Sequence, residues 1–330
     1  MTPKLPIRFL GTGAYLPERV VTNQHFVERL DTTEEWIRTR TGIRERRYAA
    51  EDQTTATMAV EAARRALQDA NLTIDDIDVI ICATATGDYP VPATATLIHA
   101  QLGAKNIPAF DIAGACAGFL HATTVAAGFL AAGIYRRALV VGAETLSRLG
   151  NPEDRRTVIL FGDGAGAAIL GPAERPGQGV LYFELGCDGQ RADYIRVPAG
   201  GSRLPASPST VAERLHYLTM KGREVYKFAV VKMEQLIDMA LDVTSLTPDD
   251  LKLVIPHQSN LRIIESARER LGLPPEKVTI NIDRYGNTSA ASVPIGLDEA
   301  RRNGTLVEGD CVLMIALGAG ITWGIMVVRL

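Results

Sequence analysis

The residue whose type and position best suit nucleophilic chemistry is Cys116. It follows a predicted strand, IPAFDI at 107–112, and a turn of small residues, AGA at 113–115, and it opens an Ala- and Gly-rich helix. At the start of a helix, the positive end of the dipole and the free backbone N–H groups lower the pKa of a thiol. A lone cysteine is more often a buried structural residue, and the other three cysteines fit that alternative. The sequence therefore predicts that Cys116 is the reactive cysteine.

An internal duplication relates two segments that lead to further candidate residues. Residues 71–82 read NLTIDDIDVIIC and residues 245–256 read SLTPDDLKLVIP, so Leu-Thr and Asp-Asp recur in the same frame. Each copy continues with a helix, a short strand and a Gly-containing turn, at a separation of roughly 170 residues. The simplest account is a chain of two similar βα halves, 1–175 and 176–330.

His257 and Asn287 lie where this duplication makes their positions informative. His257 directly follows the strand of the second copy, in VIPHQSN, and α/β proteins place their chemistry at the carboxyl ends of strands. Asn287 lies in a turn, in DRYGNTSAASVP, that the duplication places roughly where Cys116 lies in the first half. Taken alone, a histidine is more often structural and an asparagine is common in Gly-Asn turns. The matched strand end favours a catalytic position for His257.

Two glycine-rich turns could bring backbone N–H groups close to a ligand. They are Gly318-Ala319-Gly320 and the GDGAG sequence at 162–166, of which the first is the better candidate for an oxyanion hole. Neither turn fits the dinucleotide-binding pattern GxGxxG or carries a Walker A lysine. A nucleotide-dependent oxidoreductase or a kinase is therefore disfavoured.

The alternation of predicted strands and helices indicates an α/β protein with parallel sheets that are covered by helices. The stretch 117–135 lacks Asp, Glu, Lys and Arg and could imitate a membrane span. We expect a buried core helix instead, because small residues allow close packing and no second apolar segment supports insertion. The stretch 186–219, rich in Gly, Pro and Ser, is expected to be a long loop at the mouth of the site or a surface insertion.

Composition and charge exclude several classes of protein. With 330 residues, 46% of them hydrophobic and 22% charged, the chain has the composition of an ordinary globular protein. Its 35 Lys and Arg nearly balance its 38 Asp and Glu, which disfavours a nucleic-acid partner. Four scattered cysteines form no CxxC pair, and no signal-peptide pattern is visible. We therefore expect a cytoplasmic protein whose mature chain starts near Met1.

Together these residues closely resemble the beta-ketoacyl-acyl carrier protein synthase III family, the condensing enzymes that initiate type II fatty acid synthesis. The resemblance runs nearly from end to end. The segments that carry it are GTGAYLPERVVTN (11–23), DTTEEWIRTRTGIRERR (31–47), AFDIAGACAGF (109–119), DRRTVILFGDGAGAA (154–168), MKGREVYKFAV (220–230), IPHQSNLRII (255–264), DRYGNTSAASVP (283–294) and GAGITWG (318–324). It implies a thiolase-like α/β fold of two duplicated βα halves with α-β-α-β-α layers.

The resemblance also implies a reaction and the residues that perform it. Cys116 takes an acyl group from an acyl-CoA, and malonyl-acyl carrier protein then loses carbon dioxide and attacks the thioester. His257 and Asn287 stabilise the enolate, and the backbone N–H groups of Cys116 and Ala319 form the oxyanion hole. The product is a 3-ketoacyl thioester. Coenzyme A enters as a thioester substrate, and no metal or redox cofactor is needed.

Other residues are assigned to substrate binding by the same resemblance. The coenzyme A contacts are Trp36, Arg40 and Arg155, and the basic patch that docks the acidic carrier protein is Arg262 with Lys227 and Arg223. The family forms homodimers, and Val91 aligns with a position that limits acyl-chain length across the dimer interface. A small residue there predicts a pocket that accepts primers longer than acetyl. Leu317 stands where many relatives have Phe, which reshapes the site without removing a reacting group.

Three alternative functions remain to be weighed. The order Cys-His-Asn, with His257 at 141 residues from Cys116, suggests a papain-like hydrolase. That family places its cysteine near the mature N-terminus in a different local sequence, which argues against it. A relative recruited to secondary metabolism would use the same cysteine on another acyl donor or acceptor. A non-catalytic partner subunit is disfavoured, because it would have lost the nucleophile.

Overall fold

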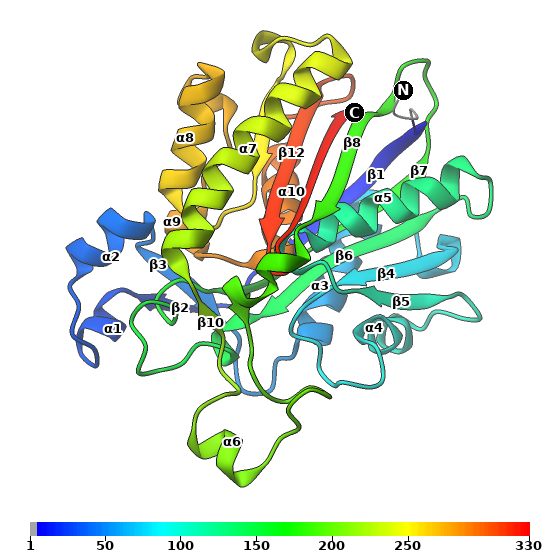
Figure 1. Ribbon diagram of the computed structural model, residues 1–330. Coiled ribbons are helices and arrows are strands. Elements are labelled where there is room, and N and C mark those ends of the chain that lie inside the picture. Colours follow the sequence, from blue (N-terminus) through cyan, green and yellow to red (C-terminus); the bar gives the residue numbers. More distant parts are fainter. Residues whose placement is uncertain (1–4) are drawn as a thin grey trace.

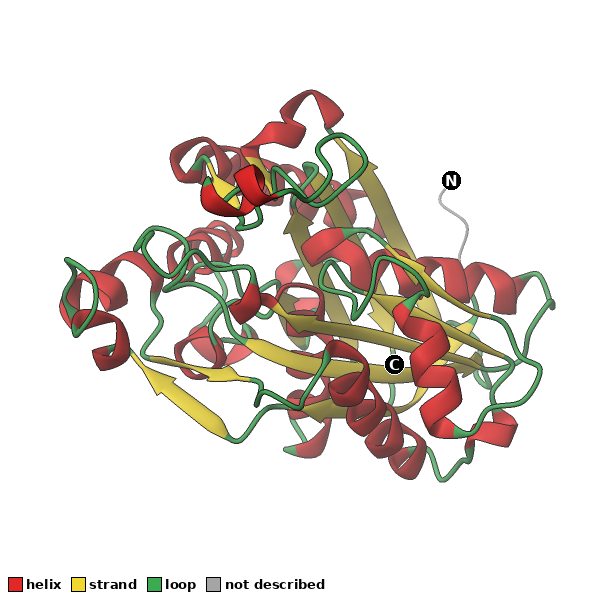
Figure 2. Cartoon of the chain, turned by 90° about the horizontal axis from the view of Figure 1, so that it is seen from below, coloured by secondary structure: helices red, strands yellow, loops and turns green. Residues whose placement is uncertain are grey.

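The centre of the molecule consists of two β-sheets, with helices around them (Figure 1; Figure 2). The computed structural model describes residues 5–330, and the expected start of the mature chain at Met1 lies outside them. The first sheet contains, in spatial order, β1 (Ile7–Tyr15), β7 (Asp163–Pro172), β6 (Ala138–Thr145), β4 (Val79–Ala83) and β5 (Ala109–Ile112). The second contains β11 (Leu253–Pro256), β12 (Cys311–Gly318), β13 (Thr322–Arg329) and β8 (Gly179–Cys187). Two small pairs are β2 (Arg19–Thr22) with β3 (Glu45–Tyr48) and β9 (Ile195–Arg196) with β10 (Thr219–Met220).

The two sheets repeat one strand order, as the duplication in the sequence implies. The run β4-β6-β7-β1 of the first sheet corresponds to β11-β12-β13-β8 of the second. β4 is parallel to β5 and β6, and β11 is parallel to β12, but the remaining neighbours are antiparallel. The prediction of parallel sheets was therefore wrong for two of the four strand pairs in the first sheet and for two of the three in the second. The turn 319–321 between β12 and β13 is too short for the crossover that a parallel pair requires.

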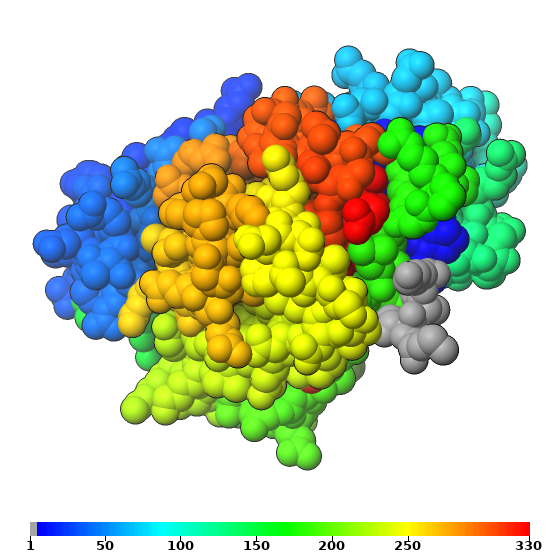
Figure 3. Space-filling model, turned by 90° about the horizontal axis from the view of Figure 1, so that it is seen from above, coloured from blue at the N-terminus to red at the C-terminus, as the bar shows by residue number. Residues whose placement is uncertain are grey.

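Helices form three layers with the sheets between them. α5 (Gly118–Ala131) and α10 (Ser292–Arg302) lie between the two sheets and contact strands of both. α3 (Thr55–Asp69) and α4 (Thr94–Leu102) cover the outer face of the first sheet. α7 (Gly222–Thr244) and α8 (Leu261–Leu271) lie side by side on the outer side of the second (Figure 3). This is the α-β-α-β-α layering expected from the sequence. The shorter helices are α1 (Gln24–Val27), α2 (Glu34–Thr41), α6 (Pro208–Ala212) and α9 (Ile282–Tyr285).

Burial explains why two of the parallel strands, β4 and β11, are continuous apolar runs. β4 (VIICA) and β11 (LVIP) are buried at every position, because helices cover both faces of each sheet. The stretch 117–135 contains α5, whose Phe119, Leu120 and Ala126 are buried between the sheets. In the part of the chain that is described, no helix is both long enough and apolar enough to span a bilayer.

The stretch 186–219 is more ordered than the expected loop. It contains β9 and α6 and forms a lobe below the second sheet in Figure 1. Ile195, Arg196 and Val197 from this segment line the main cavity described below. The segment is thus part of the wall of the site and not only a surface insertion.

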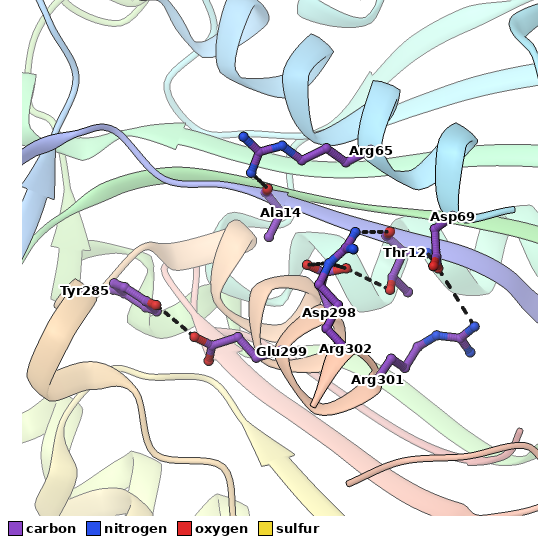
Figure 4. A network of polar contacts seen from close by, with 9 residues as sticks. All are labelled: Thr12, Ala14, Arg65, Asp69, Tyr285, Asp298, Glu299, Arg301 and Arg302. Carbon is purple, nitrogen blue, oxygen red and sulfur yellow. Dashed lines mark hydrogen bonds and ion pairs between the residues drawn. The ribbon is translucent and has the colours of Figure 1, made fainter. Parts of the chain in front are cut away.

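A polar network joins the outer helix α3 to the central helix α10 across β1 (Figure 4). The buried Asp298 accepts hydrogen bonds from Thr12 Oγ1 at 2.9 Å and from Arg302 Nε at 2.8 Å. Arg302 also donates to the Thr12 carbonyl oxygen at 3.2 Å. Arg65 donates a hydrogen bond to the Ala14 carbonyl oxygen, and Arg301 forms an ion pair with Asp69. These contacts fix α10, and with it the preceding turn that carries Asn287, relative to the first sheet.

Candidate active site

Cys116 lies at the start of the central helix α5, as predicted. A 3-10 turn, Ala115–Ala117, runs directly into α5, and Ala115 has a φ of +45°, a conformation that L-residues rarely adopt. The turn packs against β12 so closely that a Cβ on Gly318 would lie 2.7 Å from the Cys116 nitrogen. A glycine is therefore required at 318. The Cys116 side chain is partly exposed, and it faces the main cavity.

One cavity of about 280 Å³ brings the candidate reacting groups together. Cys116 comes from the first half of the chain, and His257, Asn287 and Ala319 come from the second. The wall is mostly apolar, which suits an acyl chain. It includes Leu146, Leu149, Phe161, Leu218, Met220, Phe228, Met233, Ile263 and Leu317. Of these residues, only Leu317 was identified from the sequence as a residue of the site.

The pKa of Cys116 corrects one expectation from the sequence. Burial raises the pKa of the thiol to about 11, and the charge of Glu144 acts in the same direction. Hydrogen bonds from the Ser289 hydroxyl and from the backbone N–H groups of Cys116 and Ala319 oppose this rise without overcoming it. The expected lowering of the pKa by the helix start is thus outweighed by desolvation. The resting group is a thiol, which needs a proton acceptor before it can attack.

His257 follows β11 and is held as a neutral hydrogen-bond donor. Its backbone N–H donates to the Ile315 carbonyl oxygen at 2.7 Å, and its Nδ1 lies 2.9 Å from Ser292 Oγ. The Gln258 N–H donates to Ser292 Oγ at 3.1 Å, and within residues 5–330 Nδ1 is the one acceptor that the Ser292 hydroxyl meets, so we assign the hydroxyl hydrogen to Nδ1. The proton of a neutral imidazole then resides on Nε2. Burial lowers the pKa of His257 to about 3, so the ring stays neutral at neutral pH.

Asn287 is oriented by backbone contacts with its nitrogen side available to a ligand. Its N–H donates to the Leu160 carbonyl oxygen at 2.9 Å, and its own carbonyl oxygen accepts from the Gly162 N–H at 3.1 Å. Its Oδ1 accepts from the Ser289 N–H at 2.9 Å, which leaves the Nδ2–H₂ group to donate into the cavity. Two neutral donors, His257 and Asn287, can therefore stabilise negative charge on one oxygen atom.

The glycine turn after β12 supplies the second backbone donor near the sulfur. Ala319 lines the cavity beside Cys116, and the backbone N–H groups of Cys116 and Ala319 act to lower the pKa of the thiol. Thr322 Oγ1 ties this turn to the nucleophile turn, because it lies 3.0 Å from the Gly114 carbonyl oxygen and 3.1 Å from that of Ala319. Ala319 therefore occupies the position expected of an oxyanion-hole donor.

The residues expected to contact coenzyme A form one cluster. The guanidinium carbons of Arg40 and Arg155 lie 5.6 and 5.1 Å from the centre of the Trp36 ring. Arg155 also pairs with Asp31. Asn260, a cavity residue at the start of α8, donates to the Arg40 carbonyl oxygen at 2.9 Å. This contact connects the cluster to the cavity wall.

The three basic residues expected to dock a carrier protein lie on the adjoining helices α7 and α8. Arg223, Lys227 and Arg262 are exposed. Arg262 lies 5.3 Å from the ring centre of Tyr226, which lines the cavity. Within residues 5–330, none of the three forms an ion pair, so their charges are available to a partner.

Val91 does not line the cavity of its own chain. Its side chain is 84% exposed, and the neighbouring Tyr89 is 59% exposed. Two large apolar side chains in contact with solvent on one loop are unusual for a surface that stays free.

Two residues beside the nucleophile were missed by the sequence reasoning. Glu144 ends the apolar strand ALVVGAE and is fully buried, and Ser289 lies between Glu144 and Cys116. An acidic residue at the end of an otherwise apolar buried strand was the signal that could have revealed Glu144. Among residues 5–330, no cluster of three His, Cys, Asp or Glu side chains could hold a metal ion.

Comparisons with known proteins decide the family. Residues 110–189 match the model of 3-oxoacyl-[acyl-carrier-protein (ACP)] synthase III, and residues 241–330 match its C-terminal model. A Beta-ketoacyl-[acyl-carrier-protein] synthase III of Caldanaerobacter subterraneus is 51% identical over 329 residues, which cover 100% of this chain and 99% of that protein. The chain belongs to the beta-ketoacyl-acyl carrier protein synthase III family. The resemblance found in the sequence is thus confirmed, and so is the enzyme class, an acyltransferase.

Solved structures confirm the expected thiolase-like fold of this family. A beta-ketoacyl-[acyl carrier protein] synthase III of Thermus thermophilus is 45% identical, with a TM-score of 0.91 and 98% of each chain covered. The priming beta-ketosynthase of the R1128 polyketide biosynthetic pathway is 38% identical, also with a TM-score of 0.91, and covers 100% of this chain and 98% of its own.

Proposed function

We propose that this enzyme condenses an acyl-CoA primer with malonyl-acyl carrier protein through a thioester on Cys116, and so initiates fatty acid synthesis. The observation that carries the proposal is the single cavity lined by Cys116, His257, Asn287 and Ala319. A nucleophile, two neutral donors and a backbone N–H are the groups that a decarboxylative condensation requires. No step calls for a metal or a redox cofactor.

In the first half-reaction, Cys116 attacks the carbonyl carbon of the acyl-CoA. The oxygen becomes negative in the tetrahedral intermediate and accepts hydrogen bonds from the N–H groups of Cys116 and Ala319, a role supported by the position of both residues in the cavity lining. Each donor of this kind typically contributes about 3 kcal/mol to the transition state. Collapse of the intermediate releases coenzyme A and leaves the acyl group on the sulfur.

In the second half-reaction, the malonyl thioester loses carbon dioxide and an enolate forms. His257 Nε2–H and Asn287 Nδ2–H₂ donate to the thioester oxygen on which the charge develops. A neutral imidazole suits this role, and the low pKa of His257 keeps it neutral. The enolate carbon then attacks the Cys116 thioester and releases a 3-ketoacyl-acyl carrier protein.

The entrance of the cavity supports the proposed substrates. An adenine ring can stack against Trp36, and Arg40 and Arg155 beside it can bind phosphates. The exposed charges of Arg223, Lys227 and Arg262 complement an acidic carrier protein. Both surfaces adjoin residues that line the cavity.

We propose further that the chain acts as a homodimer in the cytoplasm, with Val91 inserted into the partner's acyl pocket. The exposed apolar side chains of Tyr89 and Val91 and the free edge of β5 in the first sheet support an interface there. The division into halves 1–175 and 176–330 remains a proposal, supported by the passage of the chain from the first sheet to the second at residues 173–178.

The proposal is tested by following the mass of the intact protein. Incubation with an acyl-CoA should add one acyl group to a peptide that contains Cys116, and malonyl-acyl carrier protein should then remove it as a 3-ketoacyl product. The Cys187→Ala variant, which changes an exposed cysteine outside the cavity, is the matched control and should load normally. Stable acylation of another residue would refute the assignment of Cys116.

A role in secondary metabolism is the second candidate, and the similarity to the R1128 priming ketosynthase favours it. The two roles differ in the primer and not in the chemistry. Loading from acetyl-CoA or short branched acyl-CoA would support fatty acid initiation. Loading only from unusual acyl groups would support the second role.

A further inference from the structure

Glu144 is a buried carboxyl group that the condensation described above does not use. It is the next-to-last residue of β6 and is fully buried. The Ala85 N–H donates to both of its oxygens at 3.2 Å, Thr84 Oγ1 donates to Oε2 at 3.4 Å, and Thr86 Oγ1 donates to Oε2 as well. Within residues 5–330, no Lys or Arg side chain hydrogen-bonds to this group. A carboxyl group is rarely buried without a cation unless a proton or a function compensates.

Ser289 connects this carboxyl group to the nucleophile. Its hydroxyl donates to Glu144 Oε1 at 3.0 Å, and Ser289 lines the same cavity as Cys116, on a 3-10 turn that packs against the turn of Cys116. A hydroxyl has one hydrogen, so it cannot donate in both directions at once. While it donates to Glu144 it can accept from the thiol. When it donates to a thiolate it can accept from a protonated Glu144.

The charges around Glu144 determine what a proton transfer would do. The ionisable groups that face it are Cys116 on the nucleophile turn and Cys82 on β4, and its charge raises the pKa of both thiols. Asp163 on β7 pairs with Thr145, the residue after Glu144. Its carboxylate accepts hydrogen bonds from Ser147 and from the Ala49 N–H. Ionised Glu144 and a Cys116 thiolate therefore oppose each other, and one negative charge shared between them is the favoured state.

We propose that Ser289 and Glu144 form a proton relay that removes the thiol proton of Cys116 as the primer is loaded. As sulfur attacks the acyl carbon, the S–H electron pair stays on sulfur and the proton bonds to Ser289 Oγ. The Ser289 proton passes at the same time to Glu144 Oε1. When coenzyme A leaves as a thiolate, the Ser289 hydroxyl donates its proton to the coenzyme A sulfur and takes the proton back from Glu144, so none is gained or lost. This rests on the proposed role of Cys116 as nucleophile.

The pKa values of Cys116 and Glu144 are consistent with Glu144 as the final acceptor of the thiol proton. Burial raises the pKa of Glu144 to about 7, and it raises that of Cys116 to about 11. A general base works best when its pKa lies near the working pH. In this scheme Ser289 takes the proton from the reacting sulfur and is a catalytic residue, whereas Glu144 acts through it as a positioning residue.

Two reactions of the Cys116 sulfur distinguish a proton relay from a purely electrostatic effect of Glu144 on the thiol. Alkylation by iodoacetamide depends on the amount of thiolate, and Glu144→Gln removes a charge that opposes the thiolate. Alkylation should therefore be unchanged or faster in Glu144→Gln. Single-turnover acylation by acyl-CoA should instead be at least tenfold slower at pH 7, as expected when a general base is lost. The wild-type acylation rate should rise with pH to a plateau near 7, and this plateau should be absent from the variant.

Two further variants keep the test decisive if Glu144→Gln folds poorly. Ser289→Ala interrupts the path and keeps the carboxyl group, and it should slow acylation to a similar extent. Thr84→Val removes a contact to the same carboxylate outside the path, and it should leave the acylation rate unchanged. The proposal is overturned if Glu144→Gln changes both rates in parallel, if Ser289→Ala acylates normally, or if Thr84→Val slows acylation equally. The proposed function fails only if the wild-type enzyme is not acylated on Cys116. The three results above concern the variants, so they overturn the relay without overturning the proposed function.

Discussion

Ala115 and Ser289 are equivalent residues of the two halves, and both have a positive φ, +45° and +48°. Each begins a 3-10 turn that runs into a central helix, α5 in one half and α10 in the other. They are 174 positions apart, the offset that also separates Glu144 from Gly318. Gly318 approaches the first turn at Cys116, and Glu144 contacts the second turn at Ser289. The pseudo-symmetry therefore gives each turn an equivalent neighbour, a glycine turn with free N–H groups in one half and a buried carboxyl group in the other.

Separation of the two half-reactions is the first expectation. Cys116→Ala should lose acyl loading and keep some decarboxylation of a malonyl thioester, because the donors for the enolate remain. His257→Ala should load normally and lose decarboxylation by roughly 100-fold or more, the usual effect of removing one such donor. Radiolabelled carbon dioxide release and intact-protein mass measure the two steps. Normal decarboxylation by His257→Ala would give His257 another role.

A pH-dependent stability difference is expected from Glu144. Its pKa is raised from 4.5 to about 7 in the folded protein, so the unfolded chain loses this proton first as the pH rises. Its stabilising contribution is complete below pH 4.5 and is lost as the pH approaches 7, by roughly 3 kcal/mol. The stability of Glu144→Gln should not show this loss. The lowered pKa of buried His257 changes stability with pH in the opposite direction, but equally in the wild type and in the variant. Urea unfolding of both proteins from pH 4.5 to 8 measures the difference, and a difference independent of pH would contradict the expectation.

The sequence located the candidate residues that the structure brings into one cavity, because their positions depend on periodicity and repetition. The strand before His257 and the small-residue turn before Cys116 are local patterns. Asn287 shows the limit of the repeat, because its counterpart at the same offset is residue 113 and the counterpart of Cys116 is Ala290. The duplication thus located the turn and not the residue within it.

What the sequence could not give depends on burial by distant segments. The pKa of Cys116 is raised because desolvation by the surrounding protein has a larger effect than the hydrogen bonds that lower it. Glu144 meets Ser289 across 145 residues of chain, and no local pattern relates the two. The antiparallel halves of the sheets likewise follow from how β7 and β13 return along their neighbours, which hydrophobic patterns do not encode.

Docking of the carrier protein should be electrostatic. Arg262→Glu should raise the KM for malonyl-acyl carrier protein at least tenfold and change the KM for malonyl-CoA little, because the exposed Arg262 lies outside the reacting groups. Added salt should weaken the wild-type interaction in the same selective way. Steady-state kinetics with both donors are the measurement, and Arg270→Glu, on the last turn of α8, is a control of equal charge change. Equal effects on both donors would place Arg262 in the shared site.

The last prediction concerns the length of the primer. Val91 is exposed in the single chain, and in the proposed dimer it would enter the partner's acyl pocket. A valine leaves room there, and each extra methylene that is buried favours binding by about 0.8 kcal/mol. The wild-type protein should therefore load acyl groups longer than acetyl from a panel of straight and branched acyl-CoA thioesters. Val91→Phe should fill that room and restrict loading to the shortest primers, and Val307→Phe, at an exposed valine away from this loop, should not. Intact-protein mass spectrometry measures the mass of the acyl group that each protein takes from each acyl-CoA. Identical primer ranges for the wild type and Val91→Phe would show that Val91 does not reach the acyl chain.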